Sequence, residues 1–419
     1  MLKWRHKRYT PIGLDWAATA LRAVQLFRGK DSLQVHAALE IPIPAGSDRV
    51  SIGDGSTDDD KPSSAELLQR LILRGGFVGK DVVLHCPAEK MDMRIVELPA
   101  GNDGLPRQVI LGALKLQMGG KLSLPVEKAV HDYVPLGHDR QRGLISLMAI
   151  TADAQWIKQR IETVESMGLR CVGVEPLAYA LTRLVNRGSP GVLRVSPPPS
   201  DGNAAETTQD PTHQRLAAVL DIGYSGSTLM VSNNQGPIFC RRFALGGREI
   251  TDILAQRLLI DFYQAERLKC TYGLDCRARR ISLEKTTVGH NGAVIDGADS
   301  GNSSVPTALN YDFEADCEIA KAIYAALQSD LNDYVVALTR ALNYVITTVG
   351  GAGLEKIQLC GSGAHLKNLD EYFSSQFDLP VEIISHPLLE EIVSALPATR
   401  ARAGSWATAL GLALLKEMN

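Results

Sequence analysis

The stretch 219–232, which reads VLDIGYSGSTLMVS, concentrates residue types that can bind a phosphate group. An apolar strand runs into an aspartate, and a turn with two glycines and several hydroxyl side chains follows. Glycine lets the backbone approach a ligand closely, hydroxyl groups donate to phosphate oxygens, and an aspartate can hold a hydrated Mg²⁺. A plain hairpin, in which these residues only make the turn, explains the stretch more simply. The candidate binding residues are Asp221, Gly223, Ser225 and Thr228.

A second copy of the same plan lies near the start of the chain. Residues 12–40 and 219–244 each read as strand, aspartate, hairpin, strand, polar turn and strand, so Asp15 corresponds to Asp221. Two such halves are expected to pack as related α/β domains whose hairpins face each other across a cleft. A nucleotide would bind there, with its phosphates between the hairpins and its base near the turn at residues 361–363. The repeat therefore favours a binding site over a plain turn.

The composition is that of an ordinary globular protein. The chain has 419 residues, of which 45% are hydrophobic and 22% charged, so two or more cores are expected. The basic N-terminus does not read as a signal peptide, and no apolar run approaches the ~20 residues of a membrane-spanning helix. A net charge of −3 gives no support to nucleic-acid binding. Seven cysteines without a C-x-x-C pair fit reduced thiols in a cytosol better than disulfides or zinc.

The order of several short motifs resembles one nucleotide-binding superfamily, that of actin, sugar kinases and Hsp70. In this chain, VLDIGYSGSTLMV resembles the second phosphate loop of the superfamily, LCGSGAHLKNL resembles its adenosine loop, and AERLKCTYG resembles the segment that lies along the ribose. Its two connecting helices resemble VGVEPLAYAL and SWATALGLAL. Within the superfamily, the chain resembles the PilM family of type IV pilus assembly proteins, which are relatives of FtsA. The implied fold is an α/β, actin-like, two-domain duplicated fold with RNase H-like halves and an inserted small α+β subdomain, 1C.

The resemblance divides the chain into successive units. We expect the first half of domain 1 (subdomain 1A) at 1–76, subdomain 1C at 77–170, a return to 1A with a connecting helix at 171–186, a disordered linker at 187–214, domain 2 at 215–404 with a flexible insertion at 284–317, and a C-terminal connecting helix at 405–419. Helical spacing predicts one helix from about Arg248 to Gly273 and a long one from about Cys317 to Val349.

The resemblance also implies that the cleft binds ATP with Mg²⁺. The hairpin of Asp221 would contact the β- and γ-phosphates, and Asp15 and Asp221 would hold the metal through water. Glu266 and Lys269 share one helix face and would hold the ribose and the adenine edge, although a surface ion pair explains them too. The glycine-rich turn would bring backbone to the base or ribose, although ordinary strand-to-helix loops also contain glycine. The implied ATP-binding residues are Asp15, Thr19, Asp221, Gly223, Ser225, Thr228, Glu266, Lys269, Gly361, Ser362 and Gly363.

The first hairpin departs from the family pattern. The family usually reads Gly-Ser-Ser after Asp-Ile, whereas Trp16, Ala17 and Ala18 follow Asp15 here. The two alanines remove the glycine and one hydroxyl donor, so the phosphate grip should be weaker and hydrolysis at most slow. Glu175 is the candidate carboxylate for orienting the attacking water, although a helix-start carboxylate favoured by the macrodipole explains it as well.

The function implied is that of a cytoplasmic ATP-binding scaffold for pilus or secretion assembly, peripheral to the inner membrane. By resemblance, a groove in subdomain 1C receives the N-terminal peptide of a PilN-like inner-membrane protein, and homo-oligomers are a further option. The groove candidates are Met93, Arg94, Ile95 and Val96. Two rival functions are a small-molecule kinase of the same superfamily, for which no substrate-binding motif is found, and a nucleotide-free adaptor, which the two alanines of the first hairpin favour.

Overall fold

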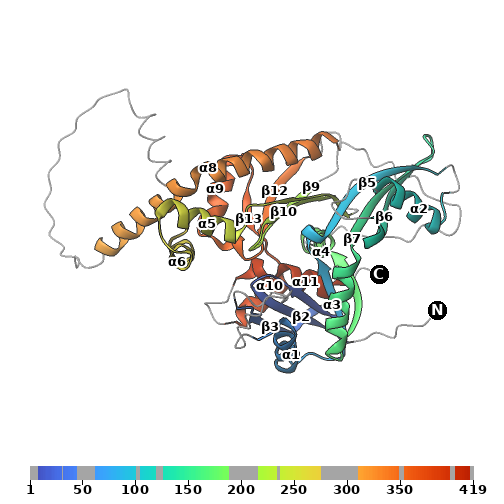
Figure 1. Cartoon of the computed structure of the whole chain (residues 1–419), viewed down its shortest axis with the longest axis horizontal. Helices are drawn as coiled ribbons and strands as arrows, with labels where there is room; N and C mark the ends of the chain where they lie inside the picture. Colours follow the sequence, from blue (N-terminus) through green and yellow to red (C-terminus); the bar gives the residue numbers. More distant parts are fainter. Residues whose placement is uncertain are drawn as a thin grey trace.

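Two five-stranded sheets of matching topology form the body of the molecule (Figure 1). The computed structural model describes residues 8–30, 32–44, 62–100, 104–118, 126–187, 216–233, 236–274, 310–348, 353–396 and 402–415. The strand orders are β3-β2-β1-β4-β8 and β11-β10-β9-β12-β13, each with three antiparallel strands followed by two parallel ones. Because the two orders agree strand for strand, the predicted duplication is confirmed.

The strands have the following bounds. The first sheet contains β1 (Ile12–Trp16), β2 (Ala20–Arg28), β3 (Leu33–Pro42), β4 (Asp81–Cys86) and β8 (Arg170–Pro176). The second contains β9 (Leu216–Ile222), β10 (Ser227–Asn233), β11 (Gly236–Phe243), β12 (Leu354–Cys360) and β13 (Val381–Ile383). The two predicted hairpins are therefore β1–β2 and β9–β10, with Asp15 and Asp221 near the ends of their first strands.

Helices cover both faces of each sheet. Between the sheets lie α4 (Leu177–Arg187), α10 (Pro387–Ser394) and α11 (Ala407–Ala413), and their apolar side chains join one core with β2, β9 and β10. On the outer face of the first sheet, α1 (Ser64–Arg74) and α3 (Ala154–Ser166) close a second core. On the outer face of the second sheet, α5 (Gly247–Leu258), α8 (Asn310–Thr348) and α9 (Leu369–Phe377) close a third. The sandwich brings the turns of both hairpins to the same cleft.

A three-stranded sheet projects beside the second sheet, at the right of Figure 1, in the order β5-β7-β6. It contains β5 (Met91–Pro99), β6 (Ala129–Asp139) and β7 (Leu144–Asp153), and α2 (Arg107–Met118) packs on one face. Strand β4, which the expected block 77–170 included, instead pairs between β1 and β8 in the first sheet. Helix α3 also packs on the first sheet, through Val164. We therefore propose that the inserted subdomain is narrower than 77–170 and comprises β5 to β7 with α2.

The helices of domain 2 differ from the prediction at one informative place. The single helix expected from Arg248 is two helices, α5 (Gly247–Leu258) and α6 (Phe262–Tyr272). Leu259 ends α5 in the left-handed region at φ 54°, and Asp261 starts α6 with a capping box to Gln264. The break turns α6 back toward α5 and so decides where the side chains of α6 point.

The remaining boundaries follow the sequence more closely. The long helix α8 (Asn310–Thr348) begins earlier than Cys317, and the last helix is preceded by a 3₁₀ turn, η6 (Ala403–Trp406). The predicted linker 187–214, apart from Arg187, and the insertion at 284–317, up to the start of α8, lie outside the described residues. Within the described ranges, no helix has the length and apolar character needed to cross a membrane.

Candidate functional site

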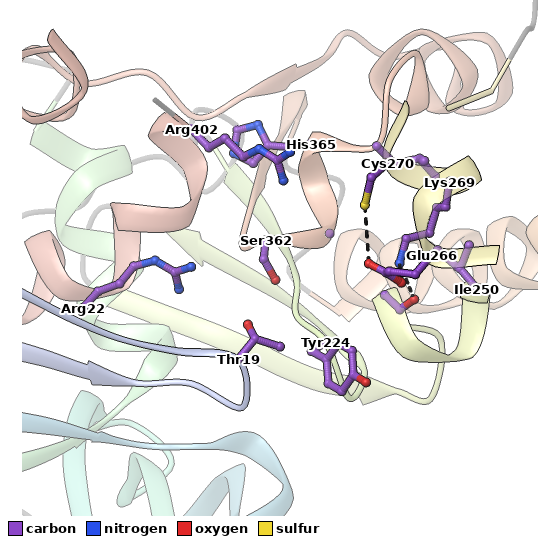
Figure 2. Close-up of a pocket in the computed structure, with 13 residues that line it drawn as sticks. Thr19, Arg22, Tyr224, Ile250, Glu266, Lys269, Cys270, Ser362, His365 and Arg402 are labelled. Atoms are coloured by element: carbon purple, nitrogen blue, oxygen red, sulfur yellow. Dashed lines mark hydrogen bonds and ion pairs between the residues drawn. The ribbon is translucent and has the colours of Figure 1, made fainter. Parts of the chain in front are cut away.

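Two neighbouring cavities lie where the hairpins meet, and both are lined by Tyr224. The first, of about 270 Å³, reaches to helix α6 and is called the α6 pocket (Figure 2). The second, of about 210 Å³, reaches to helix α3 and is called the α3 pocket. Nine of the eleven predicted ATP-binding residues divide between them, whereas Asp15 and Gly361 line neither. The α6 pocket is lined by Thr19, Glu266, Lys269, Ser362 and Gly363, and the α3 pocket by Asp221, Gly223, Ser225 and Thr228.

Asp221 is the carboxylate of the cleft with the greatest capacity for a cation. Burial and the nearby charge of Asp15 raise its pKa to about 6. Its Oδ1 accepts from the Cys360 thiol at 3.6 Å, and among the described residues no Lys or Arg lies within ion-pairing distance. A half-buried carboxylate that lines a cavity and contacts no Lys or Arg side chain is stabilised by a bound cation. Asp221 therefore fits the predicted role of holding a hydrated Mg²⁺.

Asp15 is in a different state because both of its oxygens face cationic groups. His85 Nε2 lies 3.0 Å from Oδ1, and Arg22 Nη1 lies 3.7 Å from Oδ2. Burial lowers the pKa of His85, but the hydrogen bond and the charge of Asp15 outweigh it, so the net shift is upward. Within the described chain no three His, Cys, Asp or Glu side chains gather as a metal cage. A metal ion here would need phosphate oxygens and water as its main ligands, with Asp221 as the nearer carboxylate.

The hairpin after Asp221 is fixed on the start of α5 by backbone hydrogen bonds. Gly247 N donates to Gly223 O, and Arg248 N donates to Tyr224 O, both at 2.9 Å. Gly246 permits this approach, since a Cβ there would lie 2.3 Å from Gly226 N. These bonds use the amides of Gly247 and Arg248 to hold the loop, so the start of α5 favours an anion in the cleft through its helix dipole and through the fixed position of the loop.

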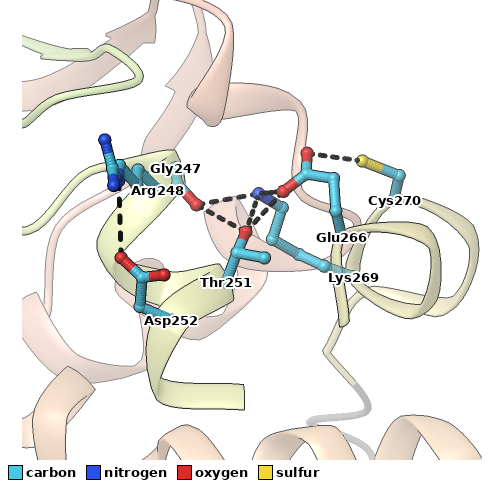
Figure 3. Close-up of polar contacts among 7 residues, drawn as sticks. All are labelled: Gly247, Arg248, Thr251, Asp252, Glu266, Lys269 and Cys270. Carbon is cyan, nitrogen blue, oxygen red and sulfur yellow. Dashed lines mark hydrogen bonds and ion pairs between the residues drawn. The ribbon is translucent and has the colours of Figure 1, made fainter. Parts of the chain in front are cut away.

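Glu266 and Lys269 form the predicted pair, and the pair also joins α5 to α6 (Figure 3). The buried Lys269 Nζ donates to Gly247 O at 2.8 Å, to Thr251 Oγ1 at 2.7 Å and to Glu266 Oε2 at 2.6 Å. Burial raises the pKa of Glu266, but its bonds to Lys269 and Thr251 outweigh that effect, so the pKa is lowered. Lys269 thus anchors the pocket wall, and the partly exposed Glu266 is the member of the pair that can meet a ligand.

The turn at residues 361–363 packs against the carboxylate of the second hairpin. Gly361 has φ +84°, and a Cβ on it would lie 2.5 Å from Asp221 Oδ1, so only glycine fits. The expected helix does not start directly after the turn: a 3₁₀ turn, η4 (Gly363–His365), intervenes before α9 begins at Leu369. The amide groups of η4, rather than the N-terminus of α9, therefore lie at the α6 pocket.

Glu175 is not on a helix and does not line either cavity. It lies on β8, where Arg183 Nη1 and Nη2 contact its two carboxylate oxygens at 2.5 Å each. Arg183 Nη1 also donates to Gly411 O at 2.9 Å, which ties α4 to α11. Burial outweighs the effect of Arg183 and raises the pKa of Glu175. With both oxygens engaged, Glu175 is placed to hold the connecting helices together and not to orient a water molecule.

Several residues that line the two pockets are not predicted as site residues from the sequence. Arg22 sits on a strand that reads as an ordinary alternating strand, yet β2 is buried on both faces and Arg22 reaches the α6 pocket. His365 and Arg402 come from segments distant in sequence and lie close together at the same pocket (Figure 2). The only sequence signal for Arg22 was its charge among apolar neighbours. The other residues missed were Tyr224, Cys270, His85, Trp156, Arg160 and Arg242.

The surroundings of His365 predict that the stability of the folded protein depends on pH. Burial, with Arg402 and Arg22 nearby, lowers its pKa from 6.5 to about 4, so the folded protein binds fewer protons there than the unfolded chain. Its contribution to stability is present above pH 6.5 and is lost as the pH falls toward 4. The melting temperature of the wild type should therefore drop more between pH 7 and pH 5 than that of His365→Gln, measured by circular dichroism. Equal drops in the two proteins would contradict this assignment.

A family model described as "Type IV pilus assembly protein PilM" matches residues 13–279, and one described as "Cell division protein FtsA" matches residues 218–411. A solved structure of the PilM-PilN type IV pilus biogenesis complex matches with a TM-score of 0.67 and 18% identity, covering 99% of this chain and 100% of the other. That likeness confirms the predicted actin-like α/β fold class.

Two more distant structures also match. They are the ethanolamine utilization protein EutJ from Carboxydothermus hydrogenoformans, with TM-score 0.45, 13% identity and coverage of 98% and 90%, and MreB 5 of Spiroplasma citri bound to AMPPNP, with TM-score 0.44, 15% identity and coverage of 99% and 97%.

Proposed function

Because this chain belongs to the PilM family of type IV pilus assembly proteins, we propose that it binds Mg-ATP in the cleft and serves as an assembly scaffold at the cytoplasmic face of the inner membrane. The observation that carries ATP binding is the meeting of two duplicated hairpins at adjoining cavities, with the half-buried Asp221 at the wall of one of them. The ATP phosphates would lie between the hairpins, and the ribose would lie near Glu266. A bound metal ion would screen the phosphate charge.

Hydrolysis would be slow or absent. The first hairpin has Ala17 and Ala18 where a glycine amide and a hydroxyl donor would act, and the Glu175 carboxylate is already paired with Arg183.

Isothermal titration calorimetry with Mg-ATP tests the binding directly. A wild type that binds no nucleotide would favour the nucleotide-free adaptor, which the pairing of Asp15 with His85 and Arg22 supports.

We propose that the partner is the cytoplasmic N-terminal peptide of a PilN-like inner-membrane protein, docked on the β5-β7-β6 subdomain. The support is the family membership and the likeness to a chain in the solved structure of the PilM-PilN type IV pilus biogenesis complex. The candidate groove residues lie on an edge strand but face different ways. Met93 is buried in the core between the sheets, Val96 packs toward α2, and Arg94 and Ile95 are exposed. Peptide contacts should therefore fall on Arg94 and Ile95.

A direct connection joins the second hairpin to this subdomain. Arg242 Nη2 on β11 donates to Ser225 O at 2.7 Å, and Arg242 Nε lies 3.7 Å from Glu89. Glu89 belongs to η1 (Ala88–Lys90), the turn that leads into β5. A phosphate that moves the hairpin would therefore move Arg242 and the entry to the subdomain together.

Glu89→Gln should uncouple peptide binding from nucleotide binding. We expect ATP to change the affinity of the wild type for a fluorescent N-terminal PilN-type peptide by about fivefold, the lower end of typical coupling, and to leave that of the variant nearly constant. The measurement is fluorescence anisotropy with and without Mg-ATP. Glu97→Gln, which removes an exposed charge from β5, is the matched control and should keep the wild-type response. A full ATP response in Glu89→Gln would rule out this route.

A further inference from the structure

We propose that Arg160 on α3 binds the terminal phosphate of the nucleotide and gives the site its preference for ATP over ADP. This inference rests on the proposed function, since it names a residue that would read the phosphate chain. Arg160 lines the α3 pocket together with Ala17 and Ala18 of the first hairpin and Ser225 of the second. One cavity thus joins the two hairpins to an arginine that comes from neither of them.

Trp16, which lies where the first hairpin departs from the family pattern, contacts the guanidinium of Arg160. The centre of the Trp16 ring lies 4.1 Å from the Arg160 guanidinium carbon. A second indole, that of Trp156, lies 5.4 Å from the same carbon. Cation–π contacts with two rings hold a long, flexible side chain in a limited range of positions. Directly before the two alanines that remove a glycine and one hydroxyl donor from the hairpin, Trp16 therefore supplies a platform for a guanidinium.

The helix that carries Arg160 is anchored at its N-terminus and along its buried face. Asp153 caps α3 by accepting from Trp156 N at 3.1 Å, and Val164 is fully buried against the first sheet. Trp156 and Arg160 are one turn apart and so lie on the same face of α3. Because α3 is anchored and the Trp16 indole packs on the guanidinium, Arg160 has a defined position relative to the first hairpin.

The charged side chains around the α3 pocket favour an anionic ligand. The wall of the α3 pocket carries the cationic side chains of Lys90, Arg160 and Arg242, against the carboxylates of Glu89 and Asp221. ATP with Mg²⁺ brings one more phosphate and more negative charge into the cleft than ADP does. A guanidinium binds phosphate oxygens through a planar fork of donors. The extra phosphate is the part of the ligand that such a cavity, on the α3 side of the hairpins, would recognise.

The test compares Mg-ATP and Mg-ADP by isothermal titration calorimetry on the full chain. Arg160→Gln should lose about tenfold in affinity for Mg-ATP and less than twofold for Mg-ADP, in line with one charge-assisted bond. Trp16→Ala should behave in the same way, and Trp16→Phe should keep most of the preference because a ring remains. Lys158→Gln is the matched control, because Lys158 is highly exposed on the same helix and pairs with Glu162. It should bind both nucleotides like the wild type.

A second measurement separates a nucleotide phosphate from free phosphate. Because Trp16 and Trp156 line the cavity, their fluorescence should change with Mg-ATP in the wild type and much less in Arg160→Gln. Inorganic phosphate alone should produce no change at concentrations where ATP saturates. A full response to free phosphate would overturn the assignment to the nucleotide.

The remaining outcomes are also decisive. Equal losses for ATP and ADP, or no loss in Arg160→Gln while the wild type binds ATP, would overturn this inference and leave the proposed function standing. A wild type that binds neither nucleotide would overturn both. Circular dichroism spectra and melting curves of each variant establish that the fold is retained.

Discussion

Replacing Asp221 with alanine is expected to lower the affinity for Mg-ATP by roughly 100-fold or more, a loss of the size of one or two charge-assisted contacts. The reason is the asymmetry of the two hairpins. Asp15 already faces His85 and Arg22, whereas Asp221 has no such cationic partner within the described chain. The capacity to bind a hydrated metal ion therefore depends mainly on Asp221. Isothermal titration calorimetry with Mg-ATP measures the loss.

The same substitution should not destabilise the protein. Burial and the charge of Asp15 raise the pKa of Asp221 to about 6, so its ionised form is unfavourable in the folded protein without a bound cation. Asp221→Ala should therefore keep or raise the melting temperature while it loses ATP binding, which separates a binding defect from misfolding. Asp252→Ala is the control, since Asp252 pairs with Arg248 on α5 away from both cavities. Wild-type affinity in Asp221→Ala would contradict the assigned role.

Replacing Arg183 with alanine is expected to be the most destabilising of the changes considered, at about 3–5 kcal/mol, the usual cost of breaking a buried ion pair by removing one partner. Side chains of Arg183 and Glu175 are 8% and 11% exposed, and the truncation would leave the Glu175 carboxylate buried without its partner. It would also leave Gly411 O without its side-chain donor where α4 meets α11. Urea unfolding followed by circular dichroism measures the change in the free energy of unfolding.

The pairing itself is tested by a double variant. Because the cost arises from an uncompensated charge, Arg183→Met combined with Glu175→Leu should recover much of the stability that Arg183→Ala loses. Arg94→Ala, which removes an exposed arginine from β5, should change the free energy of unfolding little. A loss below about 1 kcal/mol in Arg183→Ala would mean that water solvates Glu175 and that the pair does not hold the connecting helices.

Much of the site could be predicted because the chain repeats a pattern whose chemistry is local. Asp221, Gly223 and Thr228 lie on one hairpin, so their proximity follows from strand geometry. Glu266 and Lys269 could be paired from helical spacing alone. Arg160, His365 and Arg402 could not be found in this way, because each reaches the cleft from a segment far from the hairpins in sequence. Sequence spacing carries no information on such distant neighbours without the packing of the sheets.

Polar residues on strands show the same limit. The alternation in β2 suggests a strand with one solvated face, yet Arg22 and Gln25 are buried. Gln25 Nε2 donates to Thr10 O and Val78 O, and Arg22 Nε donates to Glu40 at 2.6 Å. Periodicity records which side chains share a face, but a helix layer or a partner side chain decides whether that face meets water.

The duplicated strand plan, the two aspartates and the glycine turns can be predicted from the amino-acid sequence alone, because they depend on short-range backbone geometry and on residue type. The tertiary structure decided which of those groups are available to a ligand. In the folded protein, Arg183 pairs with Glu175 and His85 pairs with Asp15, whereas Asp221 lines the α3 pocket. Availability depends on burial and on charges brought together from distant segments, and those are properties of the packed chain.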